Sequence, residues 1–541
     1  MFGYEILARE LKEWGTDTLF FLMGGPMIDA ENACEDIGIR MVDVRHEQAA
    51  VMMANAHTRI TGRPSVAMAC SGPGMMNMVT GIAHAWSDGA PIVVIGGASE
   101  LSREGTMPFQ ETDQLAVVRP ITKLAIRCTE PTLIPDVIAR AFRTAVSDSP
   151  GPVYVDLPGD VLYAEVAEAG VPSRATAVGP MRTSADPDAV RRAVDLLAEA
   201  ERPIVVSGSG VVWSGASDAL TEFVDTYRTP FYTTPMGRGV VSEKHPLSLP
   251  GSRSAALRDC DLVLQVATRQ NYIFNFMQPP KVNGSATLLQ IDVSAAQIGA
   301  NRAADVGLVG DARAVLRQLL GHADVLRAAA GRHDDWIRAL SDRDRQRQEE
   351  VRRSTQELPE TPIHPRVLSQ ELADWLPDGA ILSLDGHEIL TMGRQFIPLT
   401  RPYSLNSGAY GTMGVGLPFG IGAKVARPDS TVVVLSGDGS FGFNALELDT
   451  AVRHRIPVIC VISNNGGWTA TDRRKAGSDL GHMPYERMFE SLGCLTTRVE
   501  TIDQLRPALD KAQAFDGPSL INVITDRGAR ATTSTFTKYV T

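Results

Sequence analysis

Short runs of branched apolar residues alternate with amphipathic stretches of helical spacing along almost the whole chain. In the first part, strands are predicted at Thr18 to Leu22 and at Ser65 to Ala69, and Glu47 to Thr61 has the period of a helix. Alternating strands and helices are typical of a doubly wound α/β domain with a parallel sheet. We therefore expect one such domain over residues 1–170. Its other predicted strands are 40–44, 91–96 and 153–157.

The same alternation starts again twice further along the chain. A proline- and serine-containing linker precedes a second α/β region, expected over residues 186–345, and a third is expected over 360–530. A charged, alanine-rich stretch at 326–353 predicts a solvated helix between them. The predicted fold class is therefore α/β, with three doubly wound parallel-sheet domains and a tail at 531–541. The strands expected in the two later domains are 203–207, 262–267, 288–293, 381–384, 431–436, 457–463 and 520–525.

Composition and charge narrow the class of protein. The chain of 541 residues is 44% hydrophobic and 21% charged, as in ordinary soluble proteins. A net charge of -11 without a basic stripe argues against a nucleic-acid partner. No apolar run approaches the roughly eighteen residues of a membrane span, and the amino terminus carries charges where a signal peptide is apolar. The cysteines are scattered, without a CxxC pair, so we expect reduced thiols in a cytoplasmic protein.

Polar residues follow two neighbouring strands of the third predicted domain. The strand at 431–436 ends at a Gly-Asp-Gly turn centred on Asp438, and the strand at 457–463 ends at Asn464-Asn465. Because parallel strands joined by one helix have their carboxyl ends at the same edge of the sheet, these side chains should lie close together. Carboxylate and amide oxygens suit Mg²⁺, and the glycines let a diphosphate approach the backbone. Gly-Asp-Gly alone could be an ordinary turn, but the Asn-Asn pair favours a metal and diphosphate site.

Four further motifs accompany this site. In the first domain, Glu47 lies where a strand passes into a helix, and Ser71-Gly72-Pro73-Gly74 opens another helix. In isolation, the first would be a partner of the helix dipole and the second a glycine-rich turn. The remaining two motifs are Asp385-Gly386-His387-Glu388 and Ser407-Gly408-Ala409-Tyr410-Gly411-Thr412-Met413-Gly414.

These motifs, in this order, resemble the thiamine-diphosphate-dependent enzymes over essentially the entire chain. The run SGPGxxNxxTGIAxAxxD is close to the pattern of acetolactate synthases and acyl-CoA lyases. Tyr410 before Gly-Thr-Met-Gly and Arg394 after Met-Gly resemble the 2-hydroxyacyl-CoA lyases and oxalyl-CoA decarboxylases. Met23-Gly24-Gly25-Pro26 departs from the Gly-x-Pro-Gly of many relatives, which implies a different floor of the substrate pocket.

The resemblance implies a role for each motif residue. Mg²⁺ would be held by Asp438, Asn465 and the carbonyl of Gly467, and Glu47 would be the acid against N1′ of the thiamine aminopyrimidine. Met413 would keep the cofactor bent, while Gln110 and Glu111 would reach the cofactor of a neighbouring subunit. Further cofactor contacts are implied for Pro73, Asn77, His387, Glu388, Gly411, Gly437, Gly439, Ser440 and Trp468. Substrate contacts are predicted for Arg238, Arg401, Tyr410, Arg530 and Lys538.

The implied function is carbon–carbon cleavage of a 2-hydroxyacyl-CoA, including branched ones such as 2-hydroxyisobutyryl-CoA, to formyl-CoA and a ketone or aldehyde. Two other functions remain as alternatives. One is that of an acetolactate synthase-like enzyme, which condenses pyruvate and carries FAD, and the other is that of an oxalyl-CoA decarboxylase. A non-catalytic nucleotide-binding paralogue is disfavoured, because Glu47, Asp438, Asn465 and Met413 are all present.

The resemblance also implies partners beyond the active site. We expect dimers with shared active sites, assembled into a homotetramer. Gly208-Ser209-Gly210 in the central domain suggests a nucleotide, ADP or FAD, although a structural turn is an equal alternative. The basic, hydroxyl-rich tail at 531–541 suits the phosphates of CoA and is expected as an active-site lid, the alternative being a frayed terminus.

Overall fold

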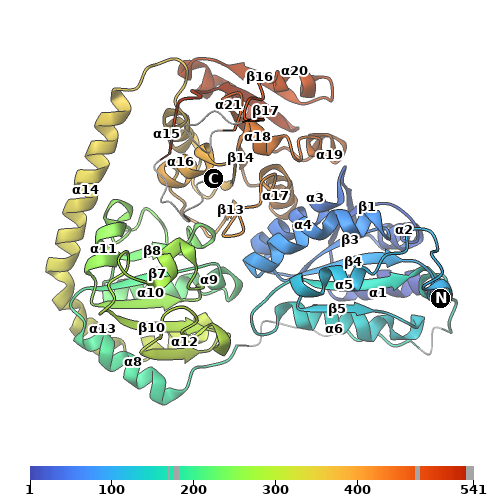
Figure 1. Cartoon of the computed structure of the whole chain (residues 1–541), viewed down its shortest axis with the longest axis horizontal. Helices are drawn as coiled ribbons and strands as arrows, with labels where there is room; N and C mark the ends of the chain where they lie inside the picture. Colours follow the sequence, from blue (N-terminus) through green and yellow to red (C-terminus); the bar gives the residue numbers. More distant parts are fainter. Residues whose placement is uncertain (168–170, 176–181, 469–475, 532–541) are drawn as a thin grey trace.

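The N-terminal domain is built on a six-stranded parallel sheet of order β2-β1-β3-β4-β6-β5 (Figure 1). The structure, a computed structural model, describes residues 1–167, 171–175, 182–468 and 476–531. The strands of this domain are β1 (Thr18–Leu22), β2 (Arg40–Asp43), β3 (Ser65–Ala69), β4 (Ile92–Ala98), β5 (Leu124–Arg127) and β6 (Val153–Pro158). Its helices are α1 (Gly3–Glu13), α2 (Ile28–Asp36), α3 (Glu47–Thr61), α4 (Pro73–Asp88), α5 (Gln114–Val118), α6 (Ile134–Val146) and α7 (Gly159–Leu162).

The central domain has a five-stranded parallel sheet of order β11-β10-β9-β7-β8. A long helix, α14 (Asp334–Gln356), then runs along the outside of the molecule towards the C-terminal domain (Figure 1). The strands are β7 (Pro203–Ser207), β8 (Phe231–Thr233), β9 (Leu262–Val266), β10 (Thr287–Asp292) and β11 (Val306–Val309). The other helices are α8 (Pro187–Glu199), α9 (Gly210–Trp213), α10 (Ser217–Tyr227), α11 (Arg253–Asp259), α12 (Ala312–Leu320) and α13 (Ala323–Ala330).

The C-terminal domain repeats the architecture of the first, with the sheet order β13-β12-β14-β15-β17-β16. β14 and β15 pair in parallel, as predicted from the single connection between them. The strands are β12 (Ile381–Asp385), β13 (Ser404–Asn406), β14 (Val432–Gly437), β15 (Ile459–Asn464), β16 (Leu495–Val499) and β17 (Ser519–Ile524). The helices are α15 (Pro365–Trp375), α16 (Glu388–Phe396), α17 (Gly416–Ala426), α18 (Asp438–Phe441), α19 (Glu447–Arg453), α20 (Tyr485–Glu490) and α21 (Leu505–Ala514).

The three predicted sheets are confirmed, and the differences are local. No residue ranges were predicted for β5, β8, β11, β13 and β16, and each lies at the edge of its sheet. β5, β11 and β16 are only partly buried and lack the continuous apolar run that marks a central strand, whereas β8 and β13 have only three residues each. The predicted solvated helix at 326–353 is wrong in part. A turn at Gly331–His333 divides it into α13 and α14, and Trp336 and Leu340 of α14 are buried.

Other features bear on the predicted class of protein. All six cysteines are free thiols, and only Cys70 is not fully buried. No helix in the described part of the chain combines the length and the apolar character that a membrane crossing requires.

The N-terminal and C-terminal domains share one hydrophobic core. Helix α3 packs against α17, and buried residues of both helices, including Met53 and Phe419, belong to the same apolar cluster. The helices approach closely at Gly422, where an added Cβ would lie 2.3 Å from the carbonyl oxygen of Met53. The missing side chain at this position therefore sets the distance between the two domains.

Gly422→Ala should destabilise the protein by roughly 1–3 kcal/mol, the usual cost of an overpacked core, because the obstructing atom belongs to the backbone and cannot rotate away. The measurement is the free energy of unfolding in urea. Gly331→Ala is the matched control, since Gly331 has φ near -64° and an added Cβ would have no atom within 4 Å. Equal stability of the two variants would contradict the close contact.

Candidate functional site

The first group of predicted site residues gathers at the carboxyl edge of the N-terminal sheet. Glu47 begins α3, and its side chain is buried. The Nδ2 of Asn77, on α4, donates to Glu47 Oε2 at 2.9 Å, which fixes the orientation of the carboxyl group. Pro73 is the first residue of α4, where its missing N–H is not needed. A side chain at Gly74 would lie 3.4 Å from Glu47 Oε1, so the glycine leaves room beside the carboxyl group.

Gln110 and Glu111, predicted to be catalytic, have different surroundings. Gln110 lies beside the glycine-rich turn, and its Oε1 accepts a hydrogen bond from Ser71 Oγ at 2.8 Å. The carboxylate of Glu111 accepts the backbone N–H groups of Gly105, at 2.5 Å, and Met107, at 2.9 Å. These two hydrogen bonds show that the Glu111 carboxylate stabilises its own loop. A catalytic role for either residue stays a prediction.

The second group lies at the carboxyl edge of the C-terminal sheet. Asp438 follows β14 directly and begins α18, and its side chain is buried. Its Oδ2 has no hydrogen-bond partner among the described residues. Burial raises the pKa of Asp438 to about 6, against the effect of the neighbouring backbone N–H groups. A buried carboxylate oxygen without a partner is unfavourable unless a cation or a proton meets it.

The residues around Asp438 fit a metal and a diphosphate. Asn465 is buried, and its Oδ1 accepts the N–H of Gly467 at 3.1 Å, which shapes the turn after β15. A side chain at Gly439 would lie 2.6 Å from the ring of Trp468, so glycine is required for this approach. Among the described residues no cluster of three or more His, Cys, Asp or Glu side chains could hold a metal. A site with one carboxylate, an amide and a carbonyl is the arrangement that Mg²⁺ accepts when phosphate and water complete its shell.

The remaining predicted cofactor residues surround the same edge. Ser440 Oγ lies 3.0 Å from Ser436 Oγ and donates to the carbonyl of Gly437. Glu388 accepts the N–H of Ala531 and lies 3.3 Å from His387 Nδ1, so its carboxylate holds the start of the C-terminal tail. A cofactor contact by Glu388 stays a prediction.

The loop after β13 carries the residues predicted to contact the aminopyrimidine. Gly411 has φ of 74°, a left-handed conformation that suits glycine. Thr412 is buried and lies within hydrogen-bond distance of His84 of α4, with 3.1 Å between Oγ1 and Nδ1. The next residue, Met413, is 40% exposed. A long apolar side chain held on an anchored loop is suited to pack against a ligand.

The predicted substrate residues do not form one group. Arg238 is buried in an ion pair with Glu243 and also donates to the carbonyl of Ile397. Arg401 is exposed at the boundary of the central and C-terminal domains. Tyr410 is exposed beside the cavity described below, and Arg530 donates to the carbonyl groups of Arg527 and Ala529. Lys538 and residues 532–541 of the predicted lid lie outside the described residues.

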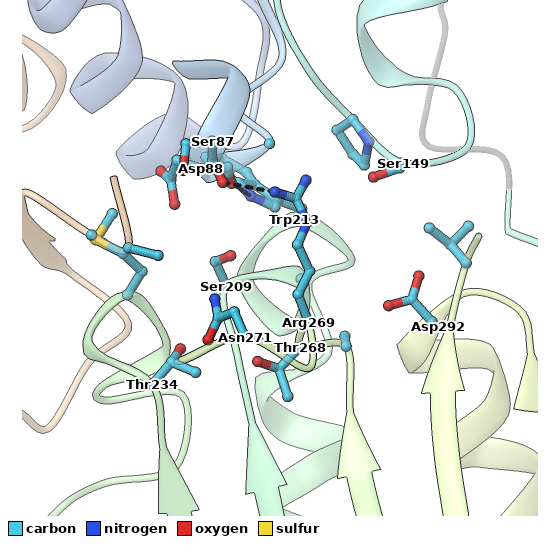
Figure 2. Close-up of a pocket in the computed structure, with 18 of the residues that line it drawn as sticks. Ser87, Asp88, Ser149, Ser209, Trp213, Thr234, Thr268, Arg269, Asn271 and Asp292 are labelled. Carbon is cyan, nitrogen blue, oxygen red and sulfur yellow. Dashed lines mark hydrogen bonds between the residues drawn. The ribbon is translucent and has the colours of Figure 1, made fainter. Parts of the chain in front are cut away.

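A cavity of about 370 Å³ lies where the three domains meet (Figure 2). The carboxyl ends of β7, β9 and β10 contribute Ser209, Thr268 and Asp292. Asp88 of the N-terminal domain lies across the cavity, and its carbonyl accepts a hydrogen bond from Trp213 Nε1 at 2.9 Å. Burial raises the pKa of Asp88 to about 6 and also raises that of Asp292.

No role was predicted from the sequence for two residues that support the site. Asp385 ends β12 and caps Gly416 and Gly386, accepting their N–H groups at 2.9 and 2.7 Å. Its position between a strand and a glycine was a usable signal. Tyr485 donates its hydroxyl proton to the carbonyl of Asp438 at 3.2 Å, a contact that no local pattern predicts.

Comparison with known proteins identifies the family of the chain. The models of the thiamine pyrophosphate enzymes match the chain in three segments, with the N-terminal TPP binding domain at 1–117, the central domain at 190–319 and the C-terminal TPP binding domain at 389–523. The 2-hydroxyacyl-CoA lyase of Oryza sativa subsp. japonica is 33% identical over 98% of this chain and 96% of its own.

Two other relatives define the branch. Human 2-hydroxyacyl-CoA lyase 1 is 29% identical over 96% of this chain and 94% of its own length. A probable acetolactate synthase large subunit of Methanococcus aeolicus is 32% identical over 97% of this chain and 92% of its own length. The chain therefore belongs to the thiamine pyrophosphate enzymes, in the branch that contains these lyases and synthases. It is a thiamine-diphosphate-dependent carbon–carbon lyase.

The buried charge of Asp438 leads to a prediction about stability and binding together. In the metal-free protein, folding favours the neutral carboxyl group, so stability falls as the pH rises from about 4 to 6. At pH 8 the free energy of unfolding of Asp438→Asn should therefore exceed that of wild type by up to about 3 kcal/mol. This difference should disappear towards pH 4. The same variant should bind Mg²⁺ and thiamine diphosphate much more weakly.

Thermal unfolding across this pH range, with and without cofactor, is the measurement. Asp429→Asn is the control, since it makes the same substitution at an exposed carboxylate in the turn before β14. Retention of cofactor by Asp438→Asn after dialysis, as in wild type, would exclude Asp438 as a metal ligand.

Proposed function

We propose that this lyase cleaves 2-hydroxyacyl-CoA thioesters, including branched ones such as 2-hydroxyisobutyryl-CoA, to formyl-CoA and a ketone or aldehyde. The bond between the thioester carbonyl carbon and the hydroxyl-bearing carbon breaks, the hydroxyl loses its proton, and the former thioester carbon gains one. No oxidant or reductant is required. The names of the relatives and Tyr410 beside the Gly411 to Met413 loop support this substrate class.

The observation that carries the proposal is that one chain contains two preorganised groups. One is the Glu47 carboxyl group oriented by Asn77, and the other is the Asp438 oxygen beside Asn465 that has no hydrogen-bond partner among the described residues. We assign Mg²⁺ and the diphosphate to Asp438, Asn465 and the carbonyl of Gly467. When bound, thiamine diphosphate supplies the electron sink for cleavage beside a carbonyl group. Glu47 would hold and transfer the proton at N1′ of the aminopyrimidine, and its buried carboxyl group is oriented by Asn77.

We further propose that a second copy of the chain covers the active-site edges, in dimers assembled into a homotetramer. Large apolar side chains stand exposed near both groups of site residues. They include Met107, Phe109, Met413, Phe443, Leu446 and Trp468. Such side chains in contiguous patches favour a protein partner. A cytoplasmic location stays a prediction from the sequence.

The start of the C-terminal tail supports its proposed use as a lid. Arg527 forms an ion pair with Asp479 at 3.0 Å, and the N–H of Ala531 is bonded to Glu388. The segment between these contacts therefore follows the edge of the sheet on which Asp438 lies. Residues beyond it would close over the CoA thioester.

The proposed reaction is tested with purified enzyme on a panel of 2-hydroxyacyl-CoA thioesters, oxalyl-CoA and pyruvate. We expect formyl-CoA from the 2-hydroxyacyl-CoA thioesters only. Glu47→Gln should bind the cofactor but lose roughly 10²- to 10⁴-fold in kcat, since it lacks the transferable proton. Glu357→Gln, on an exposed linker, is the control. If the enzyme turned over pyruvate alone, its assigned function would change from that of a lyase to that of an acetolactate synthase. Normal turnover in Glu47→Gln would refute the role of Glu47.

For the central cavity we propose ADP. Parallel α/β sheets bind nucleotides at the carboxyl ends of their strands, and an acidic residue such as Asp292 commonly receives a ribose hydroxyl. The volume of about 370 Å³ suits a mononucleotide, whereas FAD is a much larger ligand. Arg269, whose Nη1 donates to the carbonyl of Ser87 at 3.1 Å, supplies a positive charge for phosphate (Figure 2).

Calorimetric titration with ADP checks this assignment. Asp292→Asn should weaken ADP binding by about 1.5–3 kcal/mol, the usual value of a hydrogen bond to a charged group. Asp195→Asn, on the exposed face of α8, should not change it. Protein that releases flavin on denaturation, or that binds FAD in preference to ADP, would contradict the proposal.

A further inference from the structure

The two residues that precede Glu47 are bonded to a carboxylate from another domain. Glu447 is the first residue of α19 and is 1% exposed. Its Oε1 accepts the backbone N–H groups of Arg45 and His46, each at 3.1 Å. Its Oε2 accepts the hydroxyl of Thr450 at 2.7 Å. Glu447 therefore joins the C-terminal domain to the junction of β2 and α3.

The residue that follows Glu47 is held by the same turn. Gln48 donates its Nε2 to Asn444 Oδ1 at 2.9 Å. The Nδ2 of Asn444 donates to the carbonyl of Gly414 at 2.6 Å, and Gly414 directly follows Met413. Both flanks of Glu47 are thus attached to residues 444–447, and so is the end of the Met413 loop.

The chemistry of these bonds favours precise placement. Arg45 and His46 lie between the end of β2 and the start of α3, where neither the sheet ladder nor the helix accepts their N–H groups. A carboxylate bonds such groups more strongly than a neutral acceptor, and it is also favoured near the positive end of a helix. Burial raises the pKa of Glu447 to about 7, while Thr450 and the two N–H groups lower it.

Other contacts already join the two domains at this place. Asp43 is paired with Arg453 and with His454, whose Nε2 lies 2.6 Å from Asp43 Oδ1, and α3 packs on α17. These contacts hold the end of β2 and the body of α3. The bonds to Glu447 are the ones that act on the residues between them, next to Glu47.

We propose that Glu447 is a positioning residue for proton transfer by Glu47. The length of its side chain fixes the backbone at Arg45 and His46, and through it the place of the Glu47 carboxyl group. The proposal rests on the function assigned above to Glu47. A displacement of about 1 Å at a reacting group can cost roughly 10²-fold in rate, so a small change of reach should be measurable.

Two conservative variants distinguish the effect of the length of the Glu447 side chain from the effect of its charge. Glu447→Asp keeps the charge but is one methylene shorter, so it cannot bond both N–H groups. Glu447→Gln loses the charge but keeps an oxygen at the same distance, and its amide can donate to the Thr450 hydroxyl. Positioning predicts that Glu447→Asp is the more impaired of the two. A role of the charge alone predicts the opposite order, which would overturn the proposal.

Three readouts are measured on the full-length protein. Backbone amide exchange over residues 44–49, without cofactor, should be faster in Glu447→Asp than in wild type. Exchange of the C2 proton of bound thiamine diphosphate with D₂O, without substrate, should be slower by roughly 10²-fold in Glu447→Asp and by clearly less in Glu447→Gln. Cofactor affinity by calorimetry should stay close to wild type in both, because Asp438 and Asn465 are untouched.

Glu243→Asp is the matched control. Glu243 also bridges two domains, since it pairs with Arg238 and accepts the N–H of Leu399 at 2.8 Å. It should lose stability without slowing the exchange of the C2 proton. Equal slowing in Glu243→Asp and Glu447→Asp would reduce the contact to a structural one and overturn the proposal.

Glu47→Gln, measured alongside, keeps the two functional assignments distinguishable. Normal C2 proton exchange in Glu47→Gln would refute the role of Glu47 and the positioning role with it. Slow exchange in Glu47→Gln together with normal exchange in Glu447→Asp would overturn the positioning role alone.

Discussion

The contact between α3 and α17 is the constraint on which the arrangement of the catalytic domains depends. Because Gly422 has no side chain, the backbone of α17 approaches Met53 closely enough for one apolar core to extend through both domains. This approach brings the turn at 444–447 against the start of α3, where its carboxylate meets the backbone before Glu47. A wider spacing would leave those N–H groups without their acceptor. The close packing at Gly422 therefore also determines the position of the Glu47 carboxyl group.

At the carboxyl edge of the C-terminal sheet, a preorganised ligand site lowers the stability of the fold. Asp438 is buried with one oxygen unpartnered among the described residues, and the fold surrounds it with glycines and amides instead of a compensating cation. An isolated carboxylate in such a place opposes folding, and a bound cation would reverse the effect. Stability and ligand affinity are thus linked through one side chain, which is common where a site is organised before its ligand arrives.

The central cavity arises in a different way. Its floor is the carboxyl edge of one sheet, as in other α/β proteins, but its walls come from the end of α4 and from the loop before Met413. Tyr272 of the central domain donates to the carbonyl of Ala409 at 2.9 Å, so the loop also belongs to the domain boundary. A ligand in this cavity would contact all three domains.

The three α/β domains, their central strands and the motif residues at the strand ends could all be predicted from the sequence. Apolar periodicity and glycine positions are local properties, and Asp438 and Glu47 stand directly at strand ends that such patterns reveal. The edge strands β5, β11 and β16 were missed because they are only partly buried, and β8 was missed because it has only three residues. The packing of the domains was needed to show that Glu447 bonds residues about 400 positions away, that Arg238 is buried in an ion pair, and that Asp88 and Asp292 line the same cavity. Such pairings follow from how the domains pack, and packing joins residues whose separation along the chain carries no signal.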